Sequence, residues 1–121
     1  MPYPVDEQHV LVAEVALGRR LPARLRARLL RDNGGDAVSG DEGWLLFPVW
    51  DPTNFRTIRK TTNQMVNEQE AARSWKGFPP EAIAVGDSHS GDLLIVRALS
   101  AEIERWDQET AVTGSLDSLR L

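Results

Sequence analysis

The sequence predicts an α+β fold in which N-terminal helices pack on a mainly antiparallel sheet. Three observations predict this class. Apolar residues recur at helical spacing within the first 31 positions. Beyond them, compact apolar runs of strand length replace the helical period. The later runs are joined by short connections, which favour antiparallel pairing between neighbouring strands.

Size and composition favour one folded domain that spans residues 1–121. The 121 residues are 41% hydrophobic and 26% charged, which is ordinary for a globular protein, and no repeat or linker interrupts them. The chain has no cysteine, so disulfides and thiolate metal sites are excluded. Neither a signal-peptide pattern nor an apolar run of membrane-spanning length occurs. We therefore expect a cytoplasmic protein without a membrane partner.

The first helix is expected from about Asp6 to Leu17. Apolar side chains at helical spacing define its buried stripe, and Gly18 is placed to end it. The stripe comprises Val10, Ala13 and Leu17, widened by Leu11 and Val15.

The second helix has a proline start and a glycine stop. Pro22 fits the first helical position, where a missing N–H is harmless, and Asn33-Gly34-Gly35 favours a left-handed ending. Leucines at spacing four form its apolar stripe, and the arginines beside them are expected to face water. The leucines are Leu21, Leu25 and Leu29, and the arginines are Arg24, Arg28 and Arg31.

The remaining elements follow from apolar runs and caps. An aromatic-rich run predicts a strand at Gly43–Val49, followed by a turn at Asp51–Asn54. Thr61 with Gln64 matches a capping box for a polar third helix that ends near Trp75. Further strands are expected at residues 82–85, 93–97 and 102–106. Ser115 is expected to cap a closing helix that carries Leu116 and Leu119.

The charge distribution favours a basic protein partner over nucleic acid. The net charge is −4, and from Glu81 onward eight acidic residues stand against three arginines. An acidic face attracts basic partners and repels phosphate backbones. The arginine-rich second helix is the counter-argument, but the isoelectric point is near 5.1 and no aromatic residue interleaves with the arginines. We interpret those arginines as a solvated face.

One segment resembles a catalytic motif. Asp87-Ser88-His89 follows a predicted strand, as metal-binding Asp-x-His motifs do, and Asp92 could serve as a third ligand. The downstream histidines that a dinuclear phosphoesterase needs are missing. No nucleophile elbow and no glycine-rich phosphate loop occurs. We interpret the segment as a hairpin loop and predict no catalytic, metal or cofactor site. A metal-dependent hydrolase that uses Asp87 and His89 is the less favoured alternative.

The four tryptophans divide into two pairs. Trp44 and Trp106 lie in apolar strand contexts and are expected in the core. Trp50 and Trp75 flank less regular sequence, where each indole either caps the core edge or anchors a partner.

The order of these signals resembles the SMI1/KNR4 (SUKH) family. The first helix ends in Leu17-Gly18, Leu21-Pro22 opens the second, and Asn33-Gly34-Gly35 closes it. The aromatic strand at Trp44 follows where the family places one. Three later segments are also similar to family signatures: Ile83 to Leu94 with its Gly91-Asp92 step, Glu104-Arg105-Trp106-Asp107, and Ser115 to Leu119. The resemblance spans about Val10 to Leu119.

The resemblance implies a protein-binding α+β domain without catalytic residues. Bacterial members act as immunity proteins against toxins, often nucleases, and fungal members are linked to regulation of cell-wall synthesis. The leading hypothesis is therefore an immunity protein that neutralises a basic toxin domain, with an adaptor of an endogenous enzyme as the alternative. The candidate partner-binding residues are Trp50, Trp75, Asp87, His89, Asp92, Glu102, Glu104 and Asp107.

Overall fold

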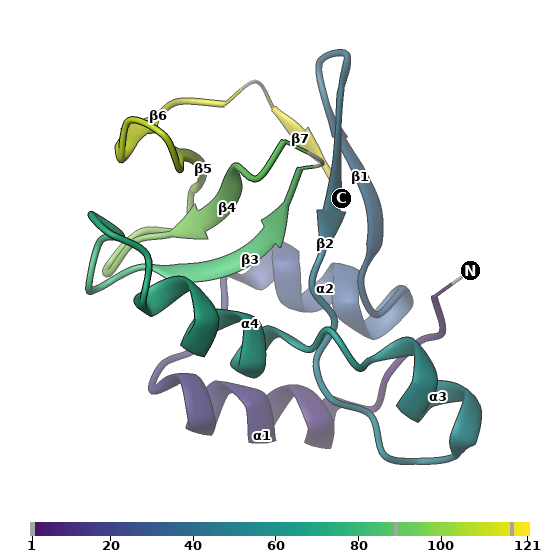
Figure 1. The fold of residues 1–121 in the computed structure, drawn as a ribbon. Coiled ribbons are helices and arrows are strands. Elements are labelled where there is room, and N and C mark those ends of the chain that lie inside the picture. The colour runs from purple at the N-terminus through teal and green to yellow at the C-terminus, as the bar shows by residue number, and fades with distance from the viewer. Residues whose placement is uncertain (1, 89, 117) are drawn as a thin grey trace.

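A computed structural model describes residues 2–88, 90–116 and 118–121. The described residues form four helices and one antiparallel sheet of seven strands in the order β6-β5-β4-β3-β2-β1-β7 (Figure 1). The helices are α1 (Glu7–Leu17), α2 (Ala23–Arg31), α3 (Phe55–Lys60) and α4 (Met65–Arg73). The strands are β1 (Gly35–Ser39), β2 (Glu42–Leu46), β3 (Ile83–Asp87), β4 (Leu93–Val96), β5 (Ile103–Asp107), β6 (Val112–Gly114) and β7 (Leu119–Arg120). The predicted α+β class is confirmed.

Helix α1 ends as predicted, but its apolar stripe is narrower than expected. Gly18 ends it in the left-handed region, at φ 85°. Val10 and Ala13 are buried, whereas Leu11 and Val15 are exposed. The expectation that these two widen the buried stripe is therefore wrong, because α1 contacts α2 and α4 along one side of the helix.

Helix α2 buries its leucines as predicted and also buries one arginine. Leu25 and Leu29 are fully buried. Arg28, expected to face water, is buried instead, and its guanidinium donates to the carbonyls of Gly34 and Asp36 at 2.9 Å each. Burial lowers the pKa of Arg28 from its ordinary value, partly offset by nearby acids. This arginine therefore fastens α2 to the start of β1 and is unavailable to a nucleic acid.

The predicted strand at Gly43–Val49 is half of a hairpin. Strand β2 ends at Leu46, and it pairs with β1, a strand that the sequence patterns did not predict. The turn between them lies at Gly40 and Asp41. Figure 1 shows this hairpin standing above the rest of the sheet.

The predicted capping box of Thr61 with Gln64 is wrong, because Gln64 itself is the N-cap of α4 and its side chain makes no capping hydrogen bond. Thr61 ends α3, a helix that was not predicted, and its hydroxyl donates to Thr57 O at 2.8 Å. The capping box present is Asn54 with Thr57, at the start of α3. The predicted polar helix is α4, which begins at Met65 and ends at Arg73.

The three later strands are confirmed as β3, β4 and β5, whereas the predicted closing helix is wrong. Leu119 pairs with Ser39 of β1 and is buried. Hydrogen bonding to the free edge of β1 satisfies backbone groups that a short helix would leave unpaired, so strand pairing prevails over helical propensity. Ser115 and Leu116 lie outside any helix, and Asp117 lies outside the described residues.

The middle strands β3 and β4 are buried on both faces, which explains their continuous apolar runs. Figure 1 shows α4 in front of the sheet and α2 behind it. On the side of α4, Phe78 meets Trp106 edge-on at 5.3 Å between ring centroids. Trp44 and Trp106 are both buried, as predicted. Among the described helices, none is long and apolar enough to cross a bilayer.

Candidate protein-binding surface

A shallow groove opens on the sheet where β1, β2 and β3 lie beyond the cover of α4. Its cavity measures about 300 Å³. The register sets Asp36 opposite Leu45, and Leu45 opposite Asp87. Residues opposite each other in a ladder share a face of the sheet, so a leucine lies between two carboxylates. Val38 and Ser88 also line the groove.

Gly86 allows β3 to approach β2 at this point. A Cβ at Gly86 would lie 2.7 Å from the carbonyl oxygen of Leu45, closer than such atoms approach. The sheet register shifts between Ala84 and Gly86, which marks an irregularity in β3. The glycine and the register shift together present Asp87 beside Leu45.

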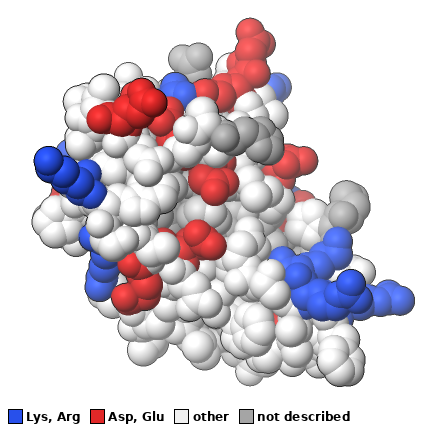
Figure 2. All heavy atoms as spheres, in the orientation of Figure 1, with Lys and Arg blue, Asp and Glu red and all other residues white. Residues whose placement is uncertain are grey.

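A third carboxylate, Glu68 of α4, lies near Asp87. Burial, and then the charge of Asp87, raise the pKa of Glu68 above its ordinary value. In the part of the chain that the structure describes, neither Asp36 nor Glu68 forms an ion pair. Figure 2 shows acidic side chains across the middle of this face and basic ones towards its edges. Negative charge is thus concentrated around an apolar groove.

Asp92 is engaged within the fold. Its carboxylate accepts from Arg105 Nε at 3.0 Å, and Arg105 also bonds Glu42 and lies 5.2 Å from the ring of Trp44. Burial alone lowers the pKa of Arg105, but the hydrogen bonds and charges of Glu42 and Asp92 outweigh it, so the net shift is upward. Asp92 therefore belongs to a cluster that fastens β5 to β2.

The other acidic candidates are dispersed. Glu102 is exposed before β5, and Glu104 is half-buried in β5, opposite Ile95. Asp107 accepts from the backbone N–H groups of Glu109 and Thr110, which shapes the turn after β5. His89 lies outside the described residues. Of the predicted acids with a described position, Asp87 alone lines the groove.

The two tryptophan candidates lie in different places. Trp75 is half-buried, with its ring 6.0 Å from Trp106, so it caps the edge of the core. Trp50 is 38% exposed and precedes the loop that leads to α3. Sequence reasoning thus selected Asp87 but missed Asp36, Leu45 and Glu68. The signal that would have located Asp36 and Leu45 is Gly40-Asp41, a two-residue hairpin turn between two strand-length segments.

The described residues include His, Asp and Glu side chains, the types that can bind metal ions. No group of three His, Asp or Glu side chains within residues 2–88, 90–116 and 118–121 is arranged to hold a metal ion. A groove with apolar walls and carboxylates is complementary in charge to a basic side chain of another protein.

The chain belongs to the SMI1/KNR4 family (SUKH-1), whose model matches residues 4–119. Membership supports a protein-binding, immunity-type domain in general, from a family that is generally non-catalytic. No curated protein and no solved structure shows significant similarity to the chain.

Proposed function

We propose that this chain is a single-domain, cytoplasmic immunity protein that binds and neutralises a cognate bacterial toxin domain of basic charge. The observation that carries the proposal is the groove in which Asp36 and Asp87 lie on either side of Leu45, with Glu68 of α4 close to Asp87. Membership of the SMI1/KNR4 family supports the same general role.

The chemistry of the groove suits a lysine or arginine of the partner. The aliphatic stem of such a side chain would pack against Leu45 and Val38, and its cationic head would meet the carboxylates. The raised pKa of Glu68 reflects unfavourable charge that a bound cation would relieve. Nuclease domains bind polyanions through basic surfaces, so a nuclease toxin fits this charge requirement.

The test is a binding titration against the protein encoded beside this gene, at increasing salt. We expect a stable complex that weakens as salt rises, because ions screen attraction between charged surfaces. Asp87→Lys and Glu68→Lys should each weaken binding about tenfold or more, since each places a cation opposite the partner's cation. Charge reversal at Asp92 or Glu104 should have smaller effects.

Glu70→Lys is the matched control for Glu68→Lys. Glu70 is exposed on the same helix, and its Oε1 atom lies 4.0 Å from Arg73 Nη1. Equal losses from the two α4 variants, or no complex with the neighbouring gene product, would refute the proposal. Capture of a housekeeping enzyme at the groove would favour the adaptor alternative. Loss of function in His89→Ala or on chelation of divalent metal would favour the hydrolase.

A further inference from the structure

A second surface, away from the groove, combines exposed apolar side chains with exposed cations. Nine large apolar side chains are exposed among the described residues, and five of them come from α1, from the loop that leads to α3 and from the first residue of α3. Those five are Leu11, Val12, Val15, Trp50 and Phe55. We call this set the α1 patch.

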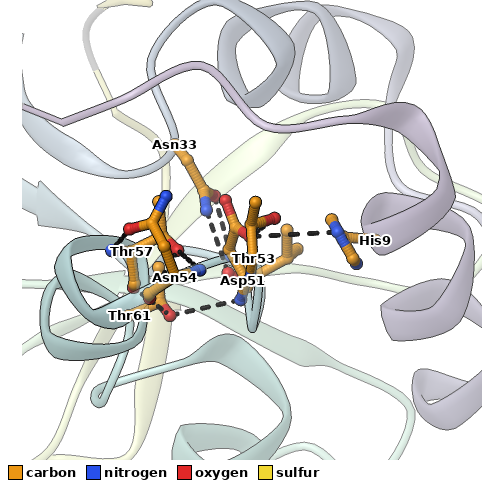
Figure 3. A network of polar contacts seen from close by, with 8 residues as sticks. His9, Asn33, Asp51, Thr53, Asn54, Thr57 and Thr61 are labelled. Carbon is orange, nitrogen blue, oxygen red and sulfur yellow. Dashed lines mark hydrogen bonds and ion pairs between the residues drawn. The ribbon is translucent and has the colours of Figure 1, made fainter.

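The two parts of the patch adjoin through His9 and Asp51. His9 Nε2 of α1 lies 3.8 Å from Asp51 Oδ1, and Figure 3 shows His9 directed at this loop. Val12 lies one helical turn beyond His9 on the same side of α1. Val12 and Val15 are 67% and 82% exposed, and Phe55 is 84% exposed, so the described residues leave all three largely uncovered.

The loop between Trp50 and Phe55, the first residue of α3, is held by hydrogen bonds. Asp51 is buried, its N–H donates to Thr61 Oγ1 at 3.2 Å, and its carboxylate accepts from Thr53 N at 3.0 Å. Asn54 Oδ1 accepts from Thr57 N at 3.1 Å at the start of α3 (Figure 3). The exposed aromatic side chains are therefore presented on an ordered frame, which lowers the entropic cost of binding.

Cations stand at one end of the patch. Arg56, Arg59 and Lys60 of α3 are exposed, and within the described residues none of them forms an ion pair. Lys60 instead lies 5.7 Å from the ring centre of Tyr3. Basic side chains also gather at one edge of the molecule in Figure 2. The exposed cations of α3 therefore create a local positive potential in a chain whose net charge is −4.

We propose that the α1 patch docks an apolar, amphipathic segment of a partner protein that carries carboxylates at the end next to α3. Apolar residues of the segment cover Val12, Val15 and Phe55, and its carboxylates pair with Arg56 and Arg59. This surface lies on other elements than the groove, and it binds an acidic segment where the groove binds a basic one. The proposal is therefore independent of the immunity role.

A second copy of the chain fits this surface less well. If two α1 helices pack antiparallel about a two-fold axis, the cations of α3 face the C-terminal end of the other α1, where Arg20 is exposed. If they pack parallel, the two α3 helices face each other. Both arrangements bring like charges together.

An anionic membrane fits less well for a different reason. The whole chain carries a net charge of −4, and Asp6 and Glu7 are exposed at the end of α1 nearest the loop. An anionic bilayer would repel both. A short acidic segment meets the α3 cations without covering the rest of the molecule.

The test is selection of binders to the intact protein from a random peptide display library. Enriched peptides should place apolar residues at helical spacing and concentrate Asp or Glu at one end. A synthetic copy of the most enriched peptide should bind Val12→Asp about tenfold or more weakly than the wild type. Val112→Asp is the matched control, because Val112 is 59% exposed on β6, outside the patch.

Charge reversal tests the orientation of the segment. Arg59→Glu should weaken binding of the acidic peptide, and a peptide whose acidic residues are changed to lysine should bind that variant more tightly than the acidic peptide does. Arg120→Glu, which changes an exposed arginine of β7, should alter the affinity for neither peptide. Thermal melts of each variant establish that it is folded. The proposal is overturned by any of four results: no enriched peptide that depends on Val12, enrichment of basic peptides, self-association abolished by Val12→Asp, or Val12-dependent binding to phosphatidylserine vesicles.

Discussion

The side-chain amide of Asn33 makes the two hydrogen bonds with the backbone of Val49 that a neighbouring strand would otherwise make. Its amide nitrogen donates to the carbonyl of Val49, and its amide oxygen accepts from the N–H of Val49, both at 2.9 Å. Asn33 and Val49 are both buried, so water cannot replace either bond. A side chain at the end of α2 therefore fixes where the chain runs after β2.

Removing this amide should be costly. Asn33→Ala leaves the buried N–H and C=O of Val49 without partners, and we expect a loss of about 2–4 kcal/mol in the free energy of unfolding. Urea denaturation measures it. Asn67→Ala, at an exposed position of α4, is the control and should change stability by less than about 0.5 kcal/mol. Equal stability of the two variants would contradict this account.

The bonds of Asn33 also show what a local pattern omits. The run Asn33-Gly34-Gly35 correctly marked where α2 ends, but the expected left-handed ending is wrong, because Asp32 caps the helix in extended backbone and positive φ follows only at Gly34 and Gly35, at 93° and 87°. The bonds to Val49 span 16 residues, and no spacing in the sequence encodes them. Likewise, the arginine spacing of α2 could not reveal that the carbonyls of Gly34 and Asp36 would bury Arg28.

At the scale of elements, a similar amide docks α4 on β3. Gln69 donates to Ala82 O at 2.9 Å and accepts from Ala84 N at 2.7 Å, and it is buried. The sequence of α4 is polar, yet α4 makes close contact with β3, in part through this side chain. The helix and the strand are thus joined by hydrogen bonds as well as by apolar contact.

Gln69→Glu should destabilise this joint in a pH-dependent way. The ionised carboxylate of the variant still accepts from Ala84 N but places negative charge against Ala82 O, so we expect a loss of about 2–3 kcal/mol at neutral pH. A protonated carboxyl donates to Ala82 O again. The pKa of the new group is therefore raised in the folded state, and the lost stability should return as the pH falls.

Urea denaturation of Gln69→Glu and of the wild type at neutral and acidic pH measures this difference. Gln69→Leu is the control, because it lacks both bonds and has no titratable group, so its deficit should not depend on pH. A deficit for Gln69→Glu that persists in acid would contradict the proposed hydrogen-bond geometry.

Elements that depend on sheet edges were the least predictable. Strands β3 and β4 have apolar runs long enough to be recognised alone. Strand β7 has two residues and exists because the edge of β1 is available to pair with it. The same applies to the groove, whose row of Asp36, Leu45 and Asp87 needs β3 to pair with the β1–β2 hairpin from far along the sequence.

At the scale of the whole molecule, charge is separated between the groove and α3, and this separation costs stability. Glu68 illustrates the cost. It lies in the first turn of α4, where the helix dipole favours a negative charge, yet burial and Asp87 raise its pKa. The ionised side chain of Glu68 is therefore less favourable in the folded protein than in the unfolded chain.

Glu68→Gln should consequently stabilise the free protein and weaken its binding to a basic partner. Because the folded pKa of Glu68 lies above the unfolded value, its contribution to stability is most favourable below the unfolded pKa and is lost as the pH rises through the folded pKa. Glu68→Gln should therefore be more stable than the wild type at neutral pH, and the difference should shrink in acid. Glu70→Gln, whose carboxylate is exposed on the same helix, should show neither change. Urea denaturation across this pH range measures the stability, and a titration at neutral pH measures the binding. If Glu68→Gln is less stable than the wild type at neutral pH, the attraction between Glu68 and the helix dipole outweighs the cost of its burial and of the charge of Asp87.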